Sequence, residues 1–127
     1  MKSILITGAT SGLGKTLSLS LKDKYNVYCI GRNDDSLEYL ASQGCNCLKV
    51  DFLKDDNWLA KISDFCHDVD ILINNAGIFP IKNFEESFEN DYDNCFHVNV
   101  KVPFMLMKEY IPKMIKQDYG KVVNILS

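Results

Sequence analysis

The sequence lacks the features that would direct a protein to a membrane or to a nucleic acid. No apolar run approaches the length of a membrane span, and the apolar start before Thr7 is too short for a signal peptide. Lys and Arg total 14 against 17 Asp and Glu, a net charge of −3, and the two signs are interspersed. This balance offers no basic surface for nucleic acid and no cationic face for a bilayer. We therefore expect a cytoplasmic protein that binds neither.

Cysteine patterns typical of metal sites and disulfide frameworks are also missing. The five cysteines are odd in number and include no C-x-x-C pair. Cys45 and Cys47 would lie on one face of a strand, but no cluster of histidine or acidic ligands accompanies them. We expect no metal site, and free thiols in a reducing compartment.

Short apolar runs alternate with stretches of helical periodicity along the whole sequence. With 127 residues, 46% of them hydrophobic, the chain has the size and apolar content of one domain, residues 1–127. Strands are expected at 3–7, 26–31, 45–50, 70–74 and 121–126, and helices from about 13, 34, 55 and 90. Five strands alternating with helices predict an α/β fold built on a doubly wound parallel sheet.

Local signals predict how the helices begin and where they change. Asp34 or Asp35 is expected to cap the second helix, and Asp55 with Asp56 to lead the third. Prolines 103 and 112 are expected to bend or divide the long helix that begins near Asn90. Five aromatic residues are expected to pack in the core and in loops, with a place at the border of the substrate as the alternative for some of them: Phe79, Phe84, Phe88, Tyr92 and Phe96. Surface or packing positions are expected for His67 and His97.

A glycine-rich stretch joins the first strand to the first helix and suits an anionic ligand. The first N–H groups of a helix have no internal partner and point outward at the positive end of its dipole. Glycines let the backbone approach a diphosphate without an intervening side chain. An ordinary packing turn is the alternative. The residues concerned are Gly8, Thr10, Ser11, Gly12, Leu13 and Gly14.

Polar or small residues follow the other expected strands as well. Because the carboxyl ends of parallel strands meet at one edge of a sheet, and ligands bind there at the switch point in strand order, these residues would line one site. They are Arg32 and Asn33, Asp51 and Phe52, Asn74 to Gly77, and Ser127.

Four motifs, in this order, resemble the N-terminal half of a classical short-chain dehydrogenase/reductase (SDR). They are Gly8-x-x-x-Gly12-x-Gly14, Asn74-Asn75-Ala76-Gly77, Asn99 within 97–100, and the run from Gly120 to Ser127. The resemblance covers the entire chain. It implies a Rossmann fold, hydride transfer between a nicotinamide cofactor and a small-molecule carbonyl or alcohol substrate, and a homodimer or homotetramer built through the long helix after Asn90.

The resemblance also implies a role for each motif. Asn74, Asn75, Ala76 and Gly77 would bind the cofactor, the last three passing beneath the nicotinamide ribose. Asn99 would hold a water of a proton relay through its main chain, and Ser127 would hydrogen-bond the substrate oxygen on which charge changes. Asp51 and Phe52 would hold the adenine edge, although an aspartate at a strand end can instead cap a turn.

The end of the second strand favours NADP(H) over NAD(H). An acidic residue there binds the ribose hydroxyls of NAD, whereas a basic one accommodates the 2′-phosphate of NADP. This sequence has Gly31 where an acid would sit, followed by Arg32 and Asn33, and a guanidinium matches a phosphate with two parallel hydrogen bonds. Asp34 and Asp35 lie close enough to leave room for NAD(H).

The resemblance breaks at the catalytic Tyr-x-x-x-Lys of the family. None of the six tyrosines has lysine four residues later, so the proton donor, and the lysine that lowers its pKa, are absent from this chain. The fifth strand would also be left as an apolar sheet edge. We therefore expect a fragment or partly described chain, truncated before that segment and inactive by itself.

Two other functions fit parts of the sequence. The stretch from Ala9 to Thr16 nearly matches the phosphate loop G-x-x-x-x-G-K-S/T, with Ala9 in place of the leading glycine. Against this, asparagines follow the fourth strand where an NTPase would place an aspartate near Mg²⁺. The other alternative is a non-catalytic half-domain that binds NADP(H) or a partner protein, which the missing tyrosine supports.

Overall fold

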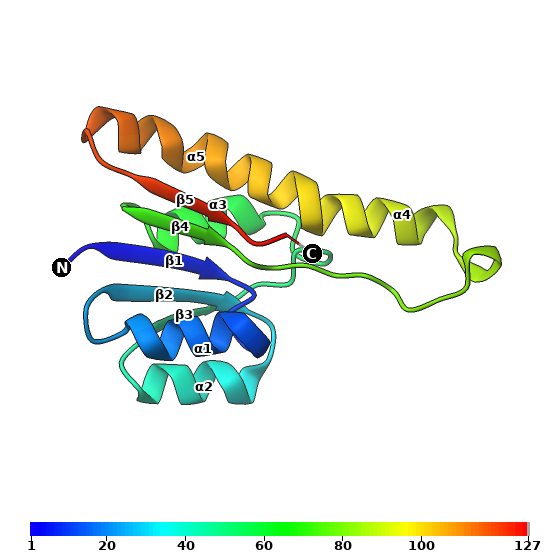
Figure 1. Ribbon diagram of the computed structural model, residues 1–127, viewed down its shortest axis with the longest axis horizontal. Helices are drawn as coiled ribbons and strands as arrows, with labels where there is room; N and C mark the ends of the chain where they lie inside the picture. The colour runs from blue at the N-terminus through cyan, green and yellow to red at the C-terminus, as the bar shows by residue number, and fades with distance from the viewer. Residues whose placement is uncertain (127) are drawn as a thin grey trace.

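The computed structural model describes residues 1–126 and shows a five-stranded parallel sheet with helices on both faces (Figure 1). The strands lie in the order β3-β2-β1-β4-β5, so the order reverses at β1. This is the doubly wound α/β arrangement predicted from the sequence. The strands are β1 (Ser3–Thr7), β2 (Asn26–Gly31), β3 (Asn46–Lys49), β4 (Ile71–Asn74) and β5 (Lys121–Asn124).

Two separate cores form because β1 alternates its side chains between the two faces of the sheet. Ile4 and Ile6 face α1 (Gly12–Leu21) and α2 (Asp34–Ser42), where Leu40 closes one core. Leu5 faces α3 (Trp58–Phe65) and α5 (Val102–Lys116), where Leu106 and Tyr110 close the other. Burial on both faces explains why β1 reads as a continuous apolar run.

The residue that caps the second helix lies before the two predicted candidates. Asn33 is its N-cap, because the Asn33 Oδ1 accepts a hydrogen bond from the Ser36 N–H at 2.9 Å. Asp34 and Asp35 lie inside the first turn, where their charges favour the positive end of the helix dipole. The prediction that one of these two aspartates caps the helix is therefore wrong.

The third helix starts later than predicted. It begins at Trp58 after the N-cap residue Asn57, rather than at Asp55 and Asp56. Asp55 instead turns back toward β3 and accepts a hydrogen bond from the Asp51 N–H at 2.8 Å. The aspartate pair was the sequence signal for the helix start. Asp55 instead holds the preceding turn through its hydrogen bond with Asp51.

One long helical rod runs from Glu89 to Lys116 and changes character in its middle. It consists of α4 (Glu89–Phe96), a π-helical turn η2 (His97–Lys101) and α5. The π turn directly precedes Pro103, which has no N–H to donate to the Asn99 carbonyl. Pro112 lies inside α5 and does not divide it.

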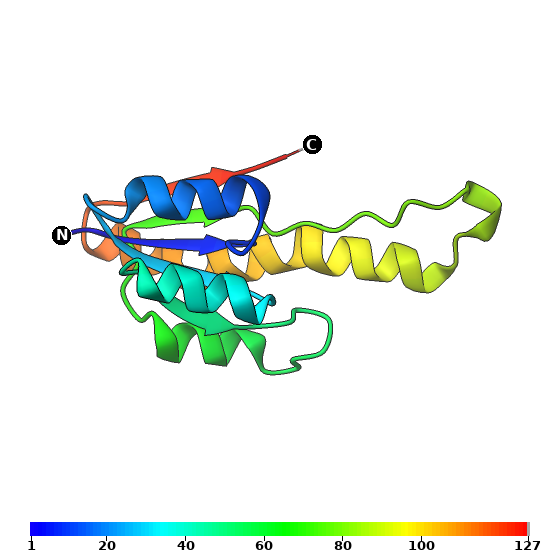
Figure 2. The same ribbon diagram turned by 90° about the horizontal axis from the view of Figure 1, so that it is seen from below.

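The segment between β4 and α4 projects away from the sheet as an arm, residues 78–88 (Figure 2). It contains a short 3₁₀ turn, η1 (Phe84–Glu86). Its aromatic residues are open to solvent, with Phe79 76% exposed and Phe84 92% exposed. Tyr92 and Phe96 on α4 stack on each other and are also exposed. The prediction that these aromatic residues pack in the core is wrong.

None of the helices within residues 1–126 combines the length and the apolar character that crossing a bilayer requires.

Gly14 tests how tightly the first helix packs on the sheet edge. We expect Gly14→Ala to destabilise the fold by about 1–3 kcal/mol, because the added methyl overlaps the Gly8 carbonyl and lies 2.6 Å from the Asn75 Nδ2. Urea unfolding followed by circular dichroism measures the effect. Ser20→Ala, at an exposed position of the same helix, is the matched control and should shift stability by less than about 0.5 kcal/mol. Equal stability of the two variants would contradict the close packing.

Candidate functional site

A set of hydrogen bonds holds the end of β1 against the chain that follows β4. The buried Thr7 Oγ1 accepts from the N–H of Asn75 at 3.1 Å and from the N–H of Ala76 at 3.0 Å. In return the Asn75 Nδ2 donates to the Gly8 carbonyl at 3.1 Å. The glycine turn and the segment 74–77 therefore behave as one unit at the point where the strand order reverses.

Steric limits explain part of the glycine pattern. Gly8 has a φ of +63°, and a Cβ there would lie 2.9 Å from the Ala76 Cα. Gly31 leaves the space that the Thr10 side chain fills. The packing interpretation of these glycines is thus correct for the inner side of the turn.

The outer side of the same turn is open, as a ligand site requires. Apart from its chain neighbours and the adjacent backbone of α1, no heavy atom of residues 1–126 lies within 4 Å of the position that a Cβ on Gly12 would take. Ser11 occupies the N-cap position of α1, but its side chain makes no capping hydrogen bond. Leu13 in the first turn is 49% exposed. The first N–H groups of α1 therefore face solvent at the positive end of the helix dipole.

A cleft of about 1050 Å³ opens beside this turn at the ends of β2 and β3. Its lining residues are Thr10, Ser11, Arg32, Asn33, Ser36, Lys49, Asp51, Lys54, Asp55 and Lys61. Four of these carry positive charge and two carry negative charge. A smaller hollow of about 120 Å³ continues it toward Phe52, Ala76, Gly77, Ile78 and Val98.

Several cations of the cleft already have acidic neighbours. Arg32 Nη1 lies 4.0 Å from Asp51 Oδ2, and Lys49 Nζ lies 3.0 Å from Asp34 Oδ1. Arg32, Lys49 and Asp34 are more than half exposed, so these pairs contribute little to stability and separate readily. The Lys49 contact also draws the Asp34 charge to the β3 side.

Asp51 caps the turn after β3, as one of the two interpretations of it predicted. Its Oδ1 accepts from the Leu53 N–H at 2.9 Å, while its other oxygen faces Arg32. Its backbone N–H holds the pKa of the Asp55 carboxyl below its ordinary value, and Lys61 lowers that pKa further. Phe52 is buried against Trp58, with ring centroids 5.2 Å apart. These contacts hold the turn against Trp58, and Asp51 and Phe52 form part of the wall of the smaller hollow.

Asn74 pairs with a residue that sequence reasoning did not single out. Its Nδ2 donates to the Asn124 Oδ1 at 2.9 Å, and the Ile125 N–H donates to the Asn74 carbonyl at 2.9 Å. Asn74 is 4% exposed, and its Oδ1 has no partner within residues 1–126. The sequence signal that could have identified this partner is Asn124, three residues before Ser127. In the sheet Asn124 lies opposite Asn74 in the pairing of β4 with β5.

Asn99 uses both ends of its amide on one residue of the arm. Its Oδ1 accepts from the Ile78 N–H at 2.8 Å, and its Nδ2 donates to the Ile78 carbonyl at 2.7 Å. The side chain therefore fixes the chain after Gly77. Its main-chain carbonyl is left without an α-helical donor, because Pro103 has no N–H.

One edge of the sheet thus brings together nearly all of the residues expected there: the glycine turn, Arg32, Asn33, Asp51, Phe52, the segment 74–77 and Asn99. Ser127 lies outside the described residues. Thr7, Lys49 and Asn124 are additions from the structure, and each follows or ends a strand beside an expected site residue.

The chain matches the family model described as short chain dehydrogenase over residues 2–127. An uncharacterised oxidoreductase of Thermotoga maritima is 36% identical to it, with 99% of this chain and 53% of that protein covered. The 3-oxoacyl-acyl-carrier-protein reductase FabG of Buchnera aphidicola, from Schizaphis graminum, is 32% identical, with 98% and 54% covered.

This chain belongs to the short-chain dehydrogenase family.

Solved structures agree on the fold. A bulky-bulky ketone specific alcohol dehydrogenase from Comamonas testosteroni is 25% identical and superposes with a TM-score of 0.90, covering 100% of this chain and 55% of its own. A short-chain dehydrogenase from Sphingobium yanoikuyae in complex with NADPH gives the same TM-score of 0.90 at 24% identity, covering 100% and 54%. The chain spans about half the length of the relatives it matches, 53% and 54% for the two named above.

The thiols of this short-chain dehydrogenase are free, and those in its core are held protonated. Burial raises the pKa of Cys29, Cys45 and Cys47, and it raises the pKa of Cys66 to about 12. A protonated thiol is a weaker nucleophile and a weaker metal ligand than a thiolate. In the part of the chain that the structure describes, no three His, Cys, Asp or Glu side chains are arranged to share a metal ion.

Thr7 tests the connection between β1 and β4. Thr7→Val keeps the side-chain shape but removes the acceptor of two N–H groups, so we expect it to lower the free energy of unfolding by about 1–3 kcal/mol. Amide hydrogen exchange at Asn75 and Ala76 should become faster, which NMR resolves residue by residue. Thr7→Ser retains the acceptor and should behave as the native chain does. Unchanged exchange in the valine variant would mean that other contacts hold this segment.

Proposed function

We propose that this chain supplies the cofactor-binding half of an oxidoreductase that transfers hydride between NADP(H) and a carbonyl or alcohol substrate. The observation that carries the proposal is the joined turn of 8–14 and segment of 74–77, which opens onto a cleft with four cations. A carbonyl or alcohol substrate also fits the names of two similar proteins, a 3-oxoacyl-acyl-carrier-protein reductase and a bulky-bulky ketone specific alcohol dehydrogenase.

Each part of the edge suits one part of a dinucleotide. The open N–H groups at the start of α1, with Ser11, Gly12 and Leu13, would hold the diphosphate. Asp51 and Phe52 would hold the adenine. The segment from Asn75 to Gly77 would lie beneath the nicotinamide ribose, since its small residues line the hollow.

The preference for NADP(H) over NAD(H) rests on charge at the end of β2. Gly31 offers no carboxylate to the ribose hydroxyls, and Arg32 with Asn33 lines the cleft where a 2′-phosphate would lie. The Asp34 carboxylate, which argued for NAD(H), is paired with Lys49. A phosphate would exchange the weak contact of Arg32 with Asp51 for a bidentate one.

The chemistry of the reaction comes from the nicotinamide ring, which gives or takes the hydride when the cofactor is bound. Ser127 would donate a hydrogen bond to the substrate oxygen on which negative charge develops. The Asn99 carbonyl would accept a hydrogen bond from a water of the proton path. The family's tyrosine and lysine are not among these 127 residues, so the complete proton transfer is not assigned to them.

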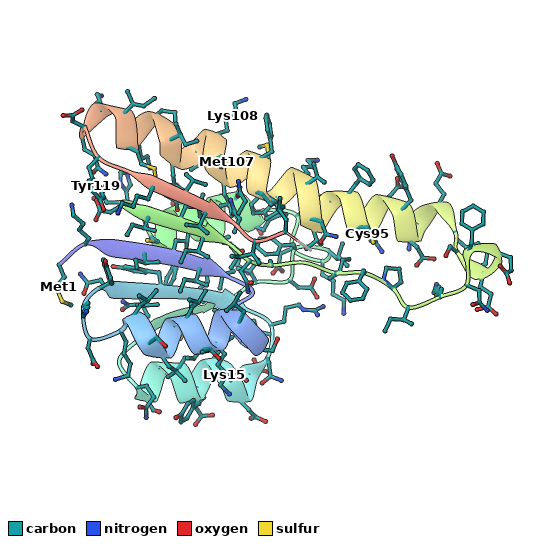
Figure 3. All side chains as sticks on the ribbon, in the orientation of Figure 1. Met1, Lys15, Cys95, Met107, Lys108 and Tyr119 are labelled. Carbon is teal, nitrogen blue, oxygen red and sulfur yellow. The ribbon has the colours of Figure 1, made fainter. Side chains whose placement is uncertain are left out.

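The phosphate-loop alternative receives no support from the lysine on which it depends. In a phosphate loop this lysine reaches the β- and γ-phosphates. Here the Lys15 Nζ lies over the Tyr39 ring of α2, 5.3 Å from its centroid, and the side chain points away from the sheet (Figure 3). Thr16 Oγ1 donates to the Gly12 carbonyl at 3.3 Å.

Titration calorimetry of the natural polypeptide with NADPH, NADH and ATP–Mg²⁺ tests the proposal. We expect NADPH to bind roughly tenfold more tightly than NADH, because a charge-assisted bidentate contact is added. Arg32→Ala should remove most of this preference and leave NADH affinity nearly unchanged. Lys116→Ala, which removes an exposed cation at the far end of α5, is the control for net charge.

Three results would redirect the proposal. Equal affinities for NADPH and NADH would contradict the role of Arg32. Tighter binding of ATP–Mg²⁺ would favour the phosphate-loop protein. NADPH binding without oxidation in the presence of a panel of ketones and aldehydes would favour the non-catalytic half-domain.

We also propose that the long helical rod pairs with its copy in a homodimer or homotetramer. Exposed apolar residues recur every fourth position along it and form one stripe: Tyr92, Phe96, Val100 and Phe104. The charges of the rod are asymmetric, with acids in the first turn of α4 and Lys113 and Lys116 in the last turn of α5. An antiparallel pair would cover the stripe and place each acidic end beside a basic end.

Phe104 tests the proposed dimer. Phe104→Glu should convert the oligomer to a monomer in sedimentation velocity, because a buried unpaired charge would face the stripe of the other copy. Ile81→Glu makes the same change at a 93% exposed position of the arm and is the matched control. A monomeric native chain, or an oligomer that survives the Phe104 change, would contradict this interface.

A further inference from the structure

The turn that would hold the adenine receives a hydrogen bond from outside itself at the Phe52 carbonyl. Within the turn, the Asp51 carbonyl accepts from the N–H groups of Lys54 and Asp55, and the Asp51 side chain accepts from the Leu53 N–H. The Phe52 carbonyl takes no part in these bonds. Among residues 1–126, its hydrogen-bond partner is the imidazole of His97, with Nε2 at 2.8 Å from the oxygen.

The position of His97 is fixed by an aromatic contact as well as by this bond. Its ring meets the Trp58 ring edge-on, with centroids 6.4 Å apart, and Trp58 in turn meets Phe52 edge-on. Trp58 and Phe52 are buried. Because a carbonyl can only accept, the His97 Nε2 must carry the proton of this bond. The histidine therefore has a directed role beyond the packing or surface role expected from the sequence.

The π turn joins both walls of the smaller hollow. His97 reaches the turn at Phe52, Asn99 reaches the arm at Ile78, and Val98 between them is buried and lines the hollow itself. Asp51, Phe52 and Leu53 also line this hollow. The two side chains act on different walls, so their effects on a bound dinucleotide are separable.

We propose that His97 is a positioning residue for the adenine half of the cofactor. The inference rests on the proposed function, since it assigns to the Asp51–Phe52 turn the adenine of NADP(H). With the bond in place, the turn is ordered before the ligand arrives. Without it, binding must order the turn, and the cost appears as weaker affinity.

Two substitutions at position 97 separate the hydrogen bond from general packing. His97→Gln can place an amide N–H close to the position of Nε2, whereas the shorter side chain of His97→Asn cannot reach the Phe52 carbonyl. The probes are 2′,5′-ADP, which carries only the adenine half, and NADP⁺. Calorimetry measures both dissociation constants in the natural polypeptide.

We expect His97→Asn to raise the dissociation constants of 2′,5′-ADP and NADP⁺ by the same factor, about fivefold for one lost hydrogen bond. His97→Gln should restore most of the affinity. Native affinity of 2′,5′-ADP for the asparagine variant would overturn the inference. So would a larger loss for NADP⁺ than for 2′,5′-ADP, because that would place the effect in the nicotinamide half. Failure of the native chain to bind either probe would instead refute the proposed function.

Discussion

The close contact between the glycine turn and the chain after β4 is the constraint on which the rest of the site depends. The Thr7 hydroxyl accepts hydrogen bonds from two N–H groups of that chain. Ala76 lies so close to Gly8 that a Cβ on Gly8 would not fit. The contact lies where the strand order reverses, so it forms the floor of the crevice that this topology creates. It also sets the direction of α1, whose first N–H groups then face outward.

Electrostatics at this edge follow from local geometry rather than from composition. The chain carries a net charge of −3, yet four cations line the cleft at the ends of β2 and β3. Lys49 pairs with Asp34, and Arg32 lies at the margin of an ion pair with Asp51. Exposed pairs of this kind are weak, so an incoming phosphate can replace an aspartate as the partner of Arg32.

The long helical rod serves two surfaces at once. Toward the sheet, the π turn presents His97 and Asn99 to two different loops of the proposed cofactor site. Away from the sheet, Val100 and Phe104 belong to the exposed apolar stripe that we propose as the subunit contact. A helix that changes from α to π over five residues alters which faces its side chains occupy, and that change lets one short stretch meet both demands.

The sequence by itself determined which segments form strands, that these strands alternate with helices in a parallel sheet, and which residues follow the strand ends. Apolar runs and glycine turns are local signals, so β1 and β2 have the predicted bounds, and the residues at strand ends meet at one edge. Only the tertiary structure decided that Asn33 caps α2, that Asn124 meets Asn74, and that the imidazole of His97 holds the Phe52 carbonyl. It also left the aromatic residues of the arm exposed. The Asn74–Asn124 contact, the His97–Phe52 contact and the exposure of the arm all depend on which distant segments lie beside a side chain. No periodicity in the sequence records those neighbours.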